Sequence, residues 1–371
     1  MEKNGVRYFV VILCAISFSF SWLPSSVISQ SQTRLIETMA GTGAPGFGGD
    51  GGPAMLAQFG TISALAVDSE GNLYVSDTSN HRIRRIDRSG IITTVAGTGT
   101  PGFNGDQRLA TTAQLAAPTG ITVDAVGNLY IADLGNHRIR RVDPSGIIIT
   151  IAGNGVAGFS GDGGLALEAS FNYPTDVVFD GLGTFYIADV GNYRVRRVDL
   201  NGIVTTVAGN GQRAFAGDGG PAPEASFKGV ANLAITPTND LLIVDRFSHR
   251  VRRIDQNGMI TTLAGDGTFG YNGDGIPADQ ASMRLPQDVA LDQAGNVYIA
   301  DFANHRIRRV DSAGIITTLA GTGASGFSGD GGPADQASLN SPSAVAVDVA
   351  GNVYFADSFN YRIRVVRATG Q

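Results

Sequence analysis

Residues 72–97 read NLYVSDTSNHRIRRIDRSGIITTVAG, and residues 128–153 repeat the pattern as NLYIADLGNHRIRRVDPSGIIITIAG, 56 positions further along the chain. A Gly-Asp pair recurs at the same interval through the whole sequence. Its aspartates are Asp50, Asp106, Asp162, Asp218, Asp274 and Asp330. Six copies at one spacing, without insertion or deletion, predict a repeat architecture for this chain of 371 residues in place of two unrelated average domains.

Each copy contains four short apolar stretches separated by turns. In the first copy they are 64–68, 72–77, 82–87 and 91–96. Gly71 and Gly90 stand where tight hairpins require a positive φ, which glycine adopts without steric cost. One copy therefore predicts a four-stranded antiparallel sheet, whose strands are called a to d in chain order. The high glycine content, 51 of 371 residues, disfavours long helices.

The two ends of the chain are complementary. The last copy ends after its strand c, whereas residues 35–41 (LIETMAG) precede the first strand a and align with residues 91–97 (IITTVAG). The N-terminal segment is expected to supply the missing strand d and so to close a ring, which favours an all-β, six-bladed β-propeller over an open solenoid. The expected blades are 62–97, 118–153, 174–209, 230–265, 286–321 and 342–367 plus 35–41, within a single domain of residues 33–371.

The N-terminus has the pattern of a secretory signal. The positively charged Lys3 and Arg7 precede an apolar stretch, residues 8–20. This stretch is too short to span a bilayer comfortably. We expect a signal peptide of residues 1–29 cleaved after Ser29, with Ser31 as the alternative site. The mature chain would then be extracytoplasmic, either periplasmic or secreted, and would carry no membrane span. An uncleaved N-terminal anchor is the alternative interpretation.

Charge and cysteine content restrict the class of partner. The formal net charge of −6 argues against a dedicated binder of nucleic acid or anionic membranes, which would need clustered cationic side chains. The single cysteine, Cys14, lies in the apolar N-terminal stretch, so the rest of the chain has no disulfide or thiolate-zinc framework. Stability is expected to come from packing.

One motif carries a family resemblance. Asn-His-Arg or Ser-His-Arg follows an (A/S/V)-D pair and precedes I/V-R-R, as in Asn80-His81-Arg82 and Ser248-His249-Arg250. Tyr193 and Tyr361 replace the histidine in two copies. The pattern resembles NHL repeats over residues 33–371. The resemblance implies a propeller fold and leaves the activity open, because NHL propellers include adaptor modules, sensor domains, RNA binders and a few lyases.

Residues that recur in every copy are interpreted as scaffold. The histidines start strand c, far from the axis, and are expected to pack at blade corners; the lyases among NHL-like propellers use zinc-binding histidines near the axis, which this sequence lacks. The arginines of strand c are expected to form solvated ion pairs with the aspartate series that begin at Asp77 and Asp87. The Gly-Phe-x-Gly-Asp-Gly-Gly-Pro-Ala element, residues 46–54, is expected to be a glycine-rich turn with an aromatic plug and a short helical turn.

Positions that break the symmetry are candidates for function. The d-to-a loops and the b-to-c turns share one face, and the d-to-a loops are about twenty residues long, which marks that face for binding. At the start of the innermost strand three adjacent blades carry Asp176, Asn232 and Asp288. The favoured interpretation is that the aspartates cap the strand entries after Pro174 and Pro286. The alternative is that the three side chains converge on the central channel, as ligands of a cation such as calcium or as acceptors for a polar substrate.

Blade 4 deviates most from the consensus. It carries Lys228, Arg246 and Phe247 in addition to Asn232, and the b-to-c turn of the next blade carries Phe302. Large apolar side chains on an exposed turn are expected to form part of a partner-binding patch.

These observations favour an exported, monomeric binding or scaffold propeller that recognises a protein or a small polar ligand. No catalytic residue is identified, because the sequence contains no nucleophile elbow, HExxH motif or phosphate-binding loop. A metal-assisted lyase or hydrolase, with a cation held by Asp176, Asn232 and Asp288, is the alternative. RNA binding through the arginine series is the least favoured interpretation, and no nucleic-acid partner is expected.

Overall fold

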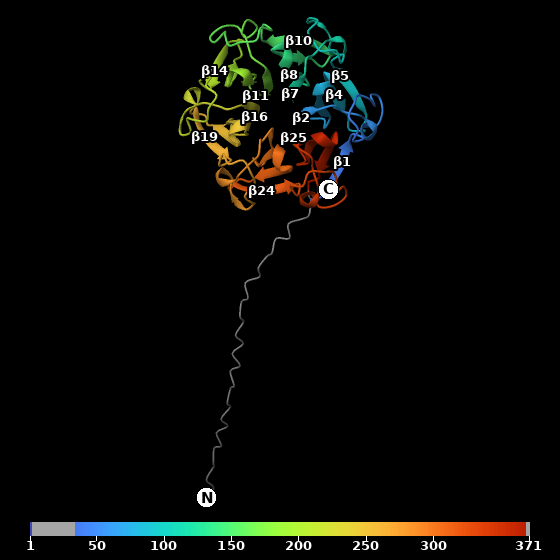
Figure 1. The fold of residues 1–371 in the computed structure, drawn as a ribbon, viewed down its shortest axis with the longest axis vertical. Helices are drawn as coiled ribbons and strands as arrows, with labels where there is room; N and C mark the ends of the chain where they lie inside the picture. Colours follow the sequence, from blue (N-terminus) through green and yellow to red (C-terminus); the bar gives the residue numbers. More distant parts are fainter. Residues whose placement is uncertain (2–33, 369–371) are drawn as a thin grey trace. The chain divides into compact units, whose positions relative to one another are not determined.

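The computed structural model describes Met1 and residues 34–368, and residues 34–368 form a ring of six blades around a central axis (Figure 1). The predicted all-β, six-bladed propeller is confirmed. Helical residues in this part of the chain occur in three-residue 3-10 turns. No helix of the described residues is long and apolar enough to cross a membrane. The predicted signal peptide of residues 1–29 lies outside the described residues.

Each blade is an antiparallel sheet. In blades 1 to 5 the four main strands run outward from the axis in chain order, and in blade 6 the N-terminal strand of the chain takes the outermost of the four places. Blade 1 contains β2 (Ile62–Val67), β3 (Leu73–Asp77), β4 (Arg82–Ile86) and β5 (Ile92–Ala96). Blade 2 contains β7 (Pro118–Val123), β8 (Leu129–Asp133), β9 (Arg138–Val142) and β10 (Ile147–Ala152). Blade 3 contains β11 (Pro174–Phe179), β12 (Phe185–Asp189), β13 (Arg194–Val198) and β14 (Val204–Ala208).

The other three blades repeat this order. Blade 4 contains β16 (Val230–Ile235), β17 (Leu241–Asp245), β18 (Arg250–Ile254) and β19 (Met259–Ala264). Blade 5 contains β21 (Val289–Leu291), β22 (Val297–Asp301), β23 (Arg306–Val310) and β24 (Ile315–Ala320). Blade 6 contains β25 (Pro342–Val347), β26 (Val353–Asp357), β27 (Arg362–Val366) and β1 (Ile36–Ala40). The two-residue strands β6 (Arg108–Leu109), β15 (Gly220–Pro221) and β20 (Ile276–Pro277) add an outer strand to blades 2, 4 and 5.

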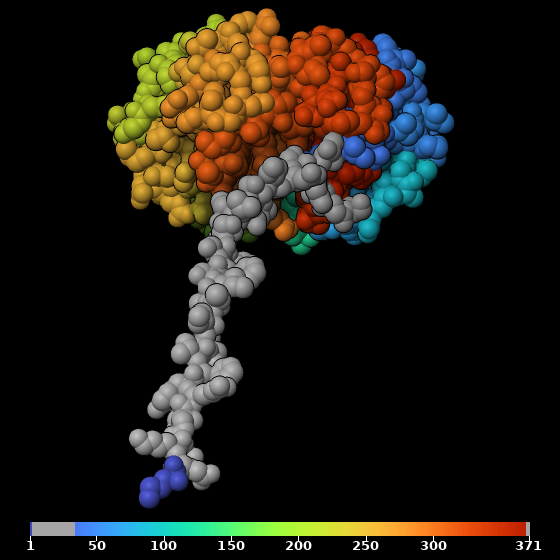
Figure 2. Space-filling model, turned by 90° about the horizontal axis from the view of Figure 1, so that it is seen from below, coloured from blue at the N-terminus to red at the C-terminus, as the bar shows by residue number. Residues whose placement is uncertain are grey.

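The N-terminal strand closes the ring as predicted. β1 pairs antiparallel with β27, with Ile36 opposite Val366, so that the sheet order is β1-β27-β26-β25. Blue residues of the first strand accordingly lie beside red residues of the last blade in both views (Figures 1 and 2). With the closing strand, blade 6 has the strands a to d that every other blade also contains.

The hydrophobic core lies between blades. One cluster joins Tyr130 and Ala132 of blade 2 to Phe171, Phe185 and Ile187 of blade 3, and the other junctions contain equivalent clusters. A blade buries both faces of its sheet only against its neighbours, so the stability of every blade depends on closure of the ring.

Substitution of the closing strand tests this dependence. Ile36 is fully buried, whereas its neighbour Leu35 is half exposed. We expect Ile36→Ala to lower the free energy of unfolding by about 2–5 kcal/mol, because it leaves a cavity at the junction of blades 5 and 6. Leu35→Ala, the matched control, should change it by less than about 0.5 kcal/mol. Urea denaturation measures both changes. Equal effects of the two substitutions would contradict a specific contribution of the closing strand to stability.

Candidate functional site

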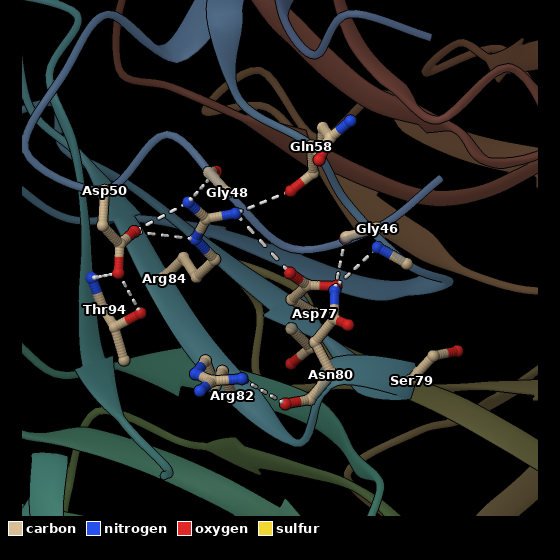
Figure 3. Close-up of polar contacts among 12 residues, drawn as sticks. Gly46, Gly48, Asp50, Gln58, Asp77, Ser79, Asn80, Arg82, Arg84 and Thr94 are labelled. Atoms are coloured by element: carbon tan, nitrogen blue, oxygen red, sulfur yellow. Dashed lines mark hydrogen bonds and ion pairs between the residues drawn. The ribbon is translucent and has the colours of Figure 1, made fainter. Parts of the chain in front are cut away.

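A buried arginine lies at the centre of each blade. Arg84 of β4 is fully buried, and its Nη2 donates to Asp50 at 2.7 Å and to the carbonyl oxygen of Gly48 at 2.8 Å (Figure 3). Its Nη1 donates to the carbonyl oxygen of Gln58 at 2.8 Å and lies 3.6 Å from Asp77 Oδ2. The same buried position is held by Arg140, Arg196, Arg252, Arg308 and Arg364. This arginine hub fastens the long d-to-a loop to strands b and c.

The hub corrects one expectation about the arginines. They were predicted to form solvated pairs, but the central guanidinium of each blade is buried because the d-to-a loop folds over it. Pairing with the Asp77 series is confirmed in five blades, whereas pairing with the Asp87 series was wrong. Asp87 Oδ1 instead accepts hydrogen bonds from the backbone N–H groups of Ser89 and Ile91 in the c-to-d turn, and none of the series forms an ion pair among the described residues.

The glycine-rich element is structural, as predicted. Its Asp50 bonds Arg84 and the hydroxyl of Thr94, its Phe47 ring lies 3.8 Å below the Arg82 guanidinium, and the 3-10 turn η1 (Ala54–Leu56) follows. The sequence reasoning missed Asp50 as a partner of the arginine. The constant spacing of 34 residues between the two, which recurs in all six copies, is the signal that identifies the pair.

The motif histidines join consecutive blades. In four blades the imidazole Nδ1 accepts a hydrogen bond from a backbone N–H at the entrance to the next blade, in the pairs His81–Ala117, His137–Tyr173, His249–Leu285 and His305–Ser341, at 3.0–3.3 Å. Burial, with a smaller contribution from Arg82, lowers the pKa of His81 and so favours the neutral acceptor. The predicted corner role is confirmed. No cluster of three or more His, Cys, Asp or Glu side chains in residues 34–368 is arranged to hold a metal ion.

The three polar residues of the innermost strands, Asp176, Asn232 and Asp288, lie together at the channel. They border a cavity of about 200 Å³ on the axis. Each also accepts a hydrogen bond from the next blade: Asp176 from the N–H of Leu233 at 2.8 Å, Asn232 from Val289 at 3.4 Å, and Asp288 from Val345 at 2.7 Å. These oxygens therefore already bind backbone N–H groups, a role that sequence analysis did not foresee.

Burial governs the protonation of the two channel carboxyls. It raises the pKa of Asp288 to about 7. It also raises the pKa of Asp176 well above its ordinary value, and the nearby Asp288 raises it further. Asp288 therefore takes up a proton near neutral pH, and each carboxyl keeps an oxygen that accepts its inter-blade hydrogen bond.

A second cavity lies at the mouth of the channel, on the face of the b-to-c turns. It has a volume of about 130 Å³ and is bordered by Asn232, Arg246, Phe247 and Gln287. Blades 1, 2 and 3 contribute hydroxyl groups to its wall. The guanidinium carbon of Arg246 lies 5.3 Å from the centre of the Phe247 ring and 5.6 Å from that of Phe302. This mouth pocket therefore combines a cation, the Phe247 ring and side-chain amides, with the Phe302 ring beside it.

Arg246 lacks a countercharge in the part of the chain that the structure describes. It is partly buried, its Nε has no hydrogen-bond partner, and burial alone lowers its pKa. Gln287 Oε1 is likewise buried without a donor among the described residues. A ligand that carries a carboxylate would supply the group that Arg246 lacks.

Sequence analysis identified only part of this pocket. Of the predicted residues, Asn232, Arg246 and Phe247 border the pocket and Phe302 lies beside it. Lys228 is exposed outside the pocket lining, and its backbone N–H donates to Asp245. The missed residues are Gln287 and the hydroxyls Ser63, Thr119 and Thr175. They occupy one equivalent position in their blades, one residue before the position that was compared, and break the symmetry there as well.

Comparison with known proteins places these repeats in a wider group. A model of the teneurin NHL domain matches residues 101–159 and 268–326, and a model of the NHL repeat matches residues 59–86 and 171–198. The SUPPRESSOR OF QUENCHING 1 protein of Arabidopsis thaliana is 31% identical over 320 residues, covering 81% of this chain and 30% of the relative. NHL repeat-containing protein 2 of Gallus gallus is 30% identical over 340 residues, covering 81% of this chain and 46% of the relative. The chain thus spans less than half the length of these relatives.

Solved structures share the fold at lower sequence identity. An auxiliary nutrient binding protein from Bacteroides thetaiotaomicron has a TM-score of 0.64 and 19% identity, covering 90% of this chain and 76% of the other. A virginiamycin B lyase from Staphylococcus aureus has a TM-score of 0.50 and 17% identity, covering 83% of this chain and 80% of the other. At these identities the likeness concerns the fold alone.

The hub yields a stability prediction. Arg84→Met removes the guanidinium and leaves the buried Asp77 carboxylate without its cation, so we expect a loss of about 3–5 kcal/mol in the free energy of unfolding. Arg85→Met, which removes the same charge from the adjacent, partly exposed position, should cost less than about 1 kcal/mol. Denaturant titration of both variants distinguishes a structural hub from a surface pair, for which the two losses would be alike.

The channel carboxyl yields a pH prediction. The pKa of Asp288 is raised in the folded chain from an ordinary 3.8 to about 7, so the folded state holds an extra proton between these values. The resulting stability is present below pH 4 and is lost as pH rises through 7. Asp288→Asn keeps an acceptor for Val345 and mimics Asn232 of blade 4.

We expect the free energy of unfolding of the parent protein to fall more steeply between pH 5 and pH 7 than that of Asp288→Asn. The slopes should differ by up to about 1.4 kcal/mol per pH unit, the value for one proton. Denaturation at pH 5, 6 and 7 measures this difference. Asp279→Asn, at an exposed position, should follow the parent curve, and parallel curves for all three proteins would contradict the assignment.

Proposed function

Since the chain is an NHL-repeat protein built as a six-bladed β-propeller, we propose that it is a binding module whose mouth pocket receives a small ligand with a carboxylate. The observation that carries this proposal is the guanidinium of Arg246, which borders the pocket without a countercharge among the described residues. A half-buried cation gains most from a ligand anion that forms charge-assisted hydrogen bonds with it.

The neighbouring side chains support the same class of ligand. The rings of Phe247 and Phe302 flank the guanidinium and offer apolar contacts to the carbon skeleton of the ligand. Asn232 and Gln287 present amide groups at the pocket wall. At about 130 Å³ the pocket accepts one functional group and its attachment, while the rest of the ligand would lie over the exposed turns.

The structural neighbours agree with a binding role at the level of fold. Two of them are described as auxiliary nutrient binding proteins, from Bacteroides thetaiotaomicron and Bacteroides ovatus. Others are described as lyases of virginiamycin B or streptogramin B. In this chain the four histidines are engaged with backbone N–H groups at blade corners, so they do not favour the lyase alternative.

We also propose that the protein is exported. The support is the charge and hydropathy pattern of residues 1–29, together with the binding-protein neighbours. N-terminal sequencing of the protein recovered from outside the cytoplasm tests this proposal; a chain that still starts at Met1 and remains in the cytoplasm would refute it.

Calorimetric titration with benzoate tests the binding proposal. We expect saturable binding that Arg246→Gln weakens at least about tenfold, the effect of losing a charge-assisted hydrogen bond. Benzamide, which lacks the negative charge, should bind the parent protein about tenfold more weakly than benzoate, and Arg246→Gln should remove this difference.

Lys228→Gln provides the matched control, because it removes the same charge from the exposed position outside the pocket. It should change benzoate affinity less than about twofold. Equal losses in the two variants would show general attraction to positive charge and would refute the mouth pocket. A stoichiometric cation in protein purified without chelator would support the metal-assisted alternative instead.

A further inference from the structure

An aromatic ring on strand b fills part of the inter-blade junction in five blades. The second residue of strand b is a tyrosine in the blades numbered 1, 2, 3, 5 and 6, namely Tyr74, Tyr130, Tyr186, Tyr298 and Tyr354. Each ring packs toward the next blade; that of Tyr130 lies 4.0 Å from the Phe179 ring of blade 3, measured between ring centres. Blade 4 carries Leu242 at this position.

The tyrosine hydroxyl binds a carboxylate in three of these junctions. Tyr130 donates to Asp124 at 2.9 Å, Tyr298 to Asp292 at 3.0 Å, and Tyr354 to Asp348 at 2.9 Å. The acceptors lie in the turn between strands a and b. Burial and the hydrogen bond to Asp124 raise the pKa of Tyr130 to about 12, which keeps the phenol protonated as a donor.

The a-to-b turn of blade 4 also contains a carboxylate, but at a different position from the other blades. Thr236 replaces the usual aspartate, and Asp240 stands where most blades have asparagine. Asp240 is buried and forms an ion pair with Arg253, whose Nη2 and Nε lie 2.6 Å and 2.8 Å from Oδ2. The same oxygen accepts a hydrogen bond from the Thr238 hydroxyl at 3.2 Å. Blade 4 thus has a carboxylate acceptor at its a-to-b turn but lacks the tyrosine whose hydroxyl donates to the carboxylate in other blades.

A groove occupies this junction. It has a volume of about 560 Å³ and lies between blades 4 and 5, with apolar walls from Leu242, Leu263 and Leu291 and a polar end at Asp240 and Arg253. At the junction of blades 2 and 3 the positions of Leu242 and Leu291 are held by Tyr130 and Phe179. Two aliphatic side chains leave space that two aromatic rings fill there.

The groove is separate from the mouth pocket. Its rim is formed by a-to-b and c-to-d turns, including Gly295 and Gly314, whereas the mouth pocket is bordered by b-to-c turns. In an antiparallel blade these two sets of turns lie at opposite ends of the strands. A ligand in the groove would therefore bind the opposite face of the ring.

We propose that this groove binds a phenol. The ring takes the place that tyrosine occupies in the other blades, between Leu242 and Leu291, and its hydroxyl donates to Asp240. A neutral donor suits this end of the groove, because the Asp240 carboxylate accepts hydrogen bonds and its charge is already balanced by Arg253. The volume exceeds that of one ring and falls within the range of small-molecule sites, so it accommodates a substituent on the ring.

Titration of the full chain with p-cresol, followed by NMR of leucine methyl groups, tests the proposal. We expect saturable shifts of Leu242, Leu263 and Leu291. Toluene, which lacks the hydroxyl, should bind about tenfold more weakly. Absence of p-cresol binding, or equal affinity for toluene, would overturn the proposal.

Two variants fill the groove from opposite walls. Leu242→Tyr restores the residue of the other five blades, and Leu291→Phe introduces the ring that blade 3 carries as Phe179. Each is expected to weaken p-cresol binding at least tenfold, and the second keeps the test decisive if the first does not fold. Undiminished binding in the folded variants would place p-cresol elsewhere and overturn the proposal.

A matched variant recreates the groove at another junction. Tyr298→Leu gives blade 5 the residue of blade 4 and is expected to add a second p-cresol site beside Asp292. Arg246→Gln should leave p-cresol binding unchanged, so that failure at the mouth pocket and failure at the groove are distinguishable. No gain of a site in folded Tyr298→Leu would contradict the equivalence of ligand and tyrosine ring.

Discussion

The buried arginine of each blade is the interaction on which the arrangement of the loops depends. The last part of a long d-to-a loop packs on the core through side chains such as Ala57 and Phe59. Its glycine-rich part is held by its Asp50-type carboxylate and by carbonyl oxygens such as that of Gly48, all bound to one guanidinium. Removing a paired charge from water is costly, and the cost is offset only when the polar groups find partners with good geometry. The planar guanidinium meets this requirement with several acceptors at once and so defines the course of the loop. The six loops, held in this way, and the turns beside them determine the shape of the channel mouth.

The fold was predictable because the repeat period carries topological information. Equal spacing of equivalent residues, together with residues 35–41 as a separated strand d, is sufficient for the number of blades and the closure of the ring. The burial of Arg84 was not predictable in the same way. The period shows that Arg84 and Asp50 are equivalent in every copy, but it does not show that the loop folds back over strand c. That contact depends on the three-dimensional course of about twenty residues, for which hydropathy patterns contain little information.

The candidate site was predictable where symmetry fails. Arg246 and Phe247 differ from their counterparts in other blades, and both border the mouth pocket. Asp176 and Asp288 also differ, yet their oxygens bind backbone N–H groups of the next blade, because the innermost strands approach each other closely around the axis. Deviation from the repeat therefore identifies a place with a distinct role, and the structure is needed to separate a ligand contact from a contact between blades.

Blade 4 concentrates such deviations at both ends of one strand. β17 begins near Leu242, in the wall of the groove, and ends immediately before Arg246, at the mouth pocket. The hub of this blade is nevertheless retained, since Arg252 lies 2.6 Å from Asp218. Because the hub lies on strand c and the d-to-a loop, substitutions at the two ends of strand b leave its loop contacts in place. A repeat protein in which each blade has its own internal fastening can thus alter one blade for binding while the other five maintain the ring.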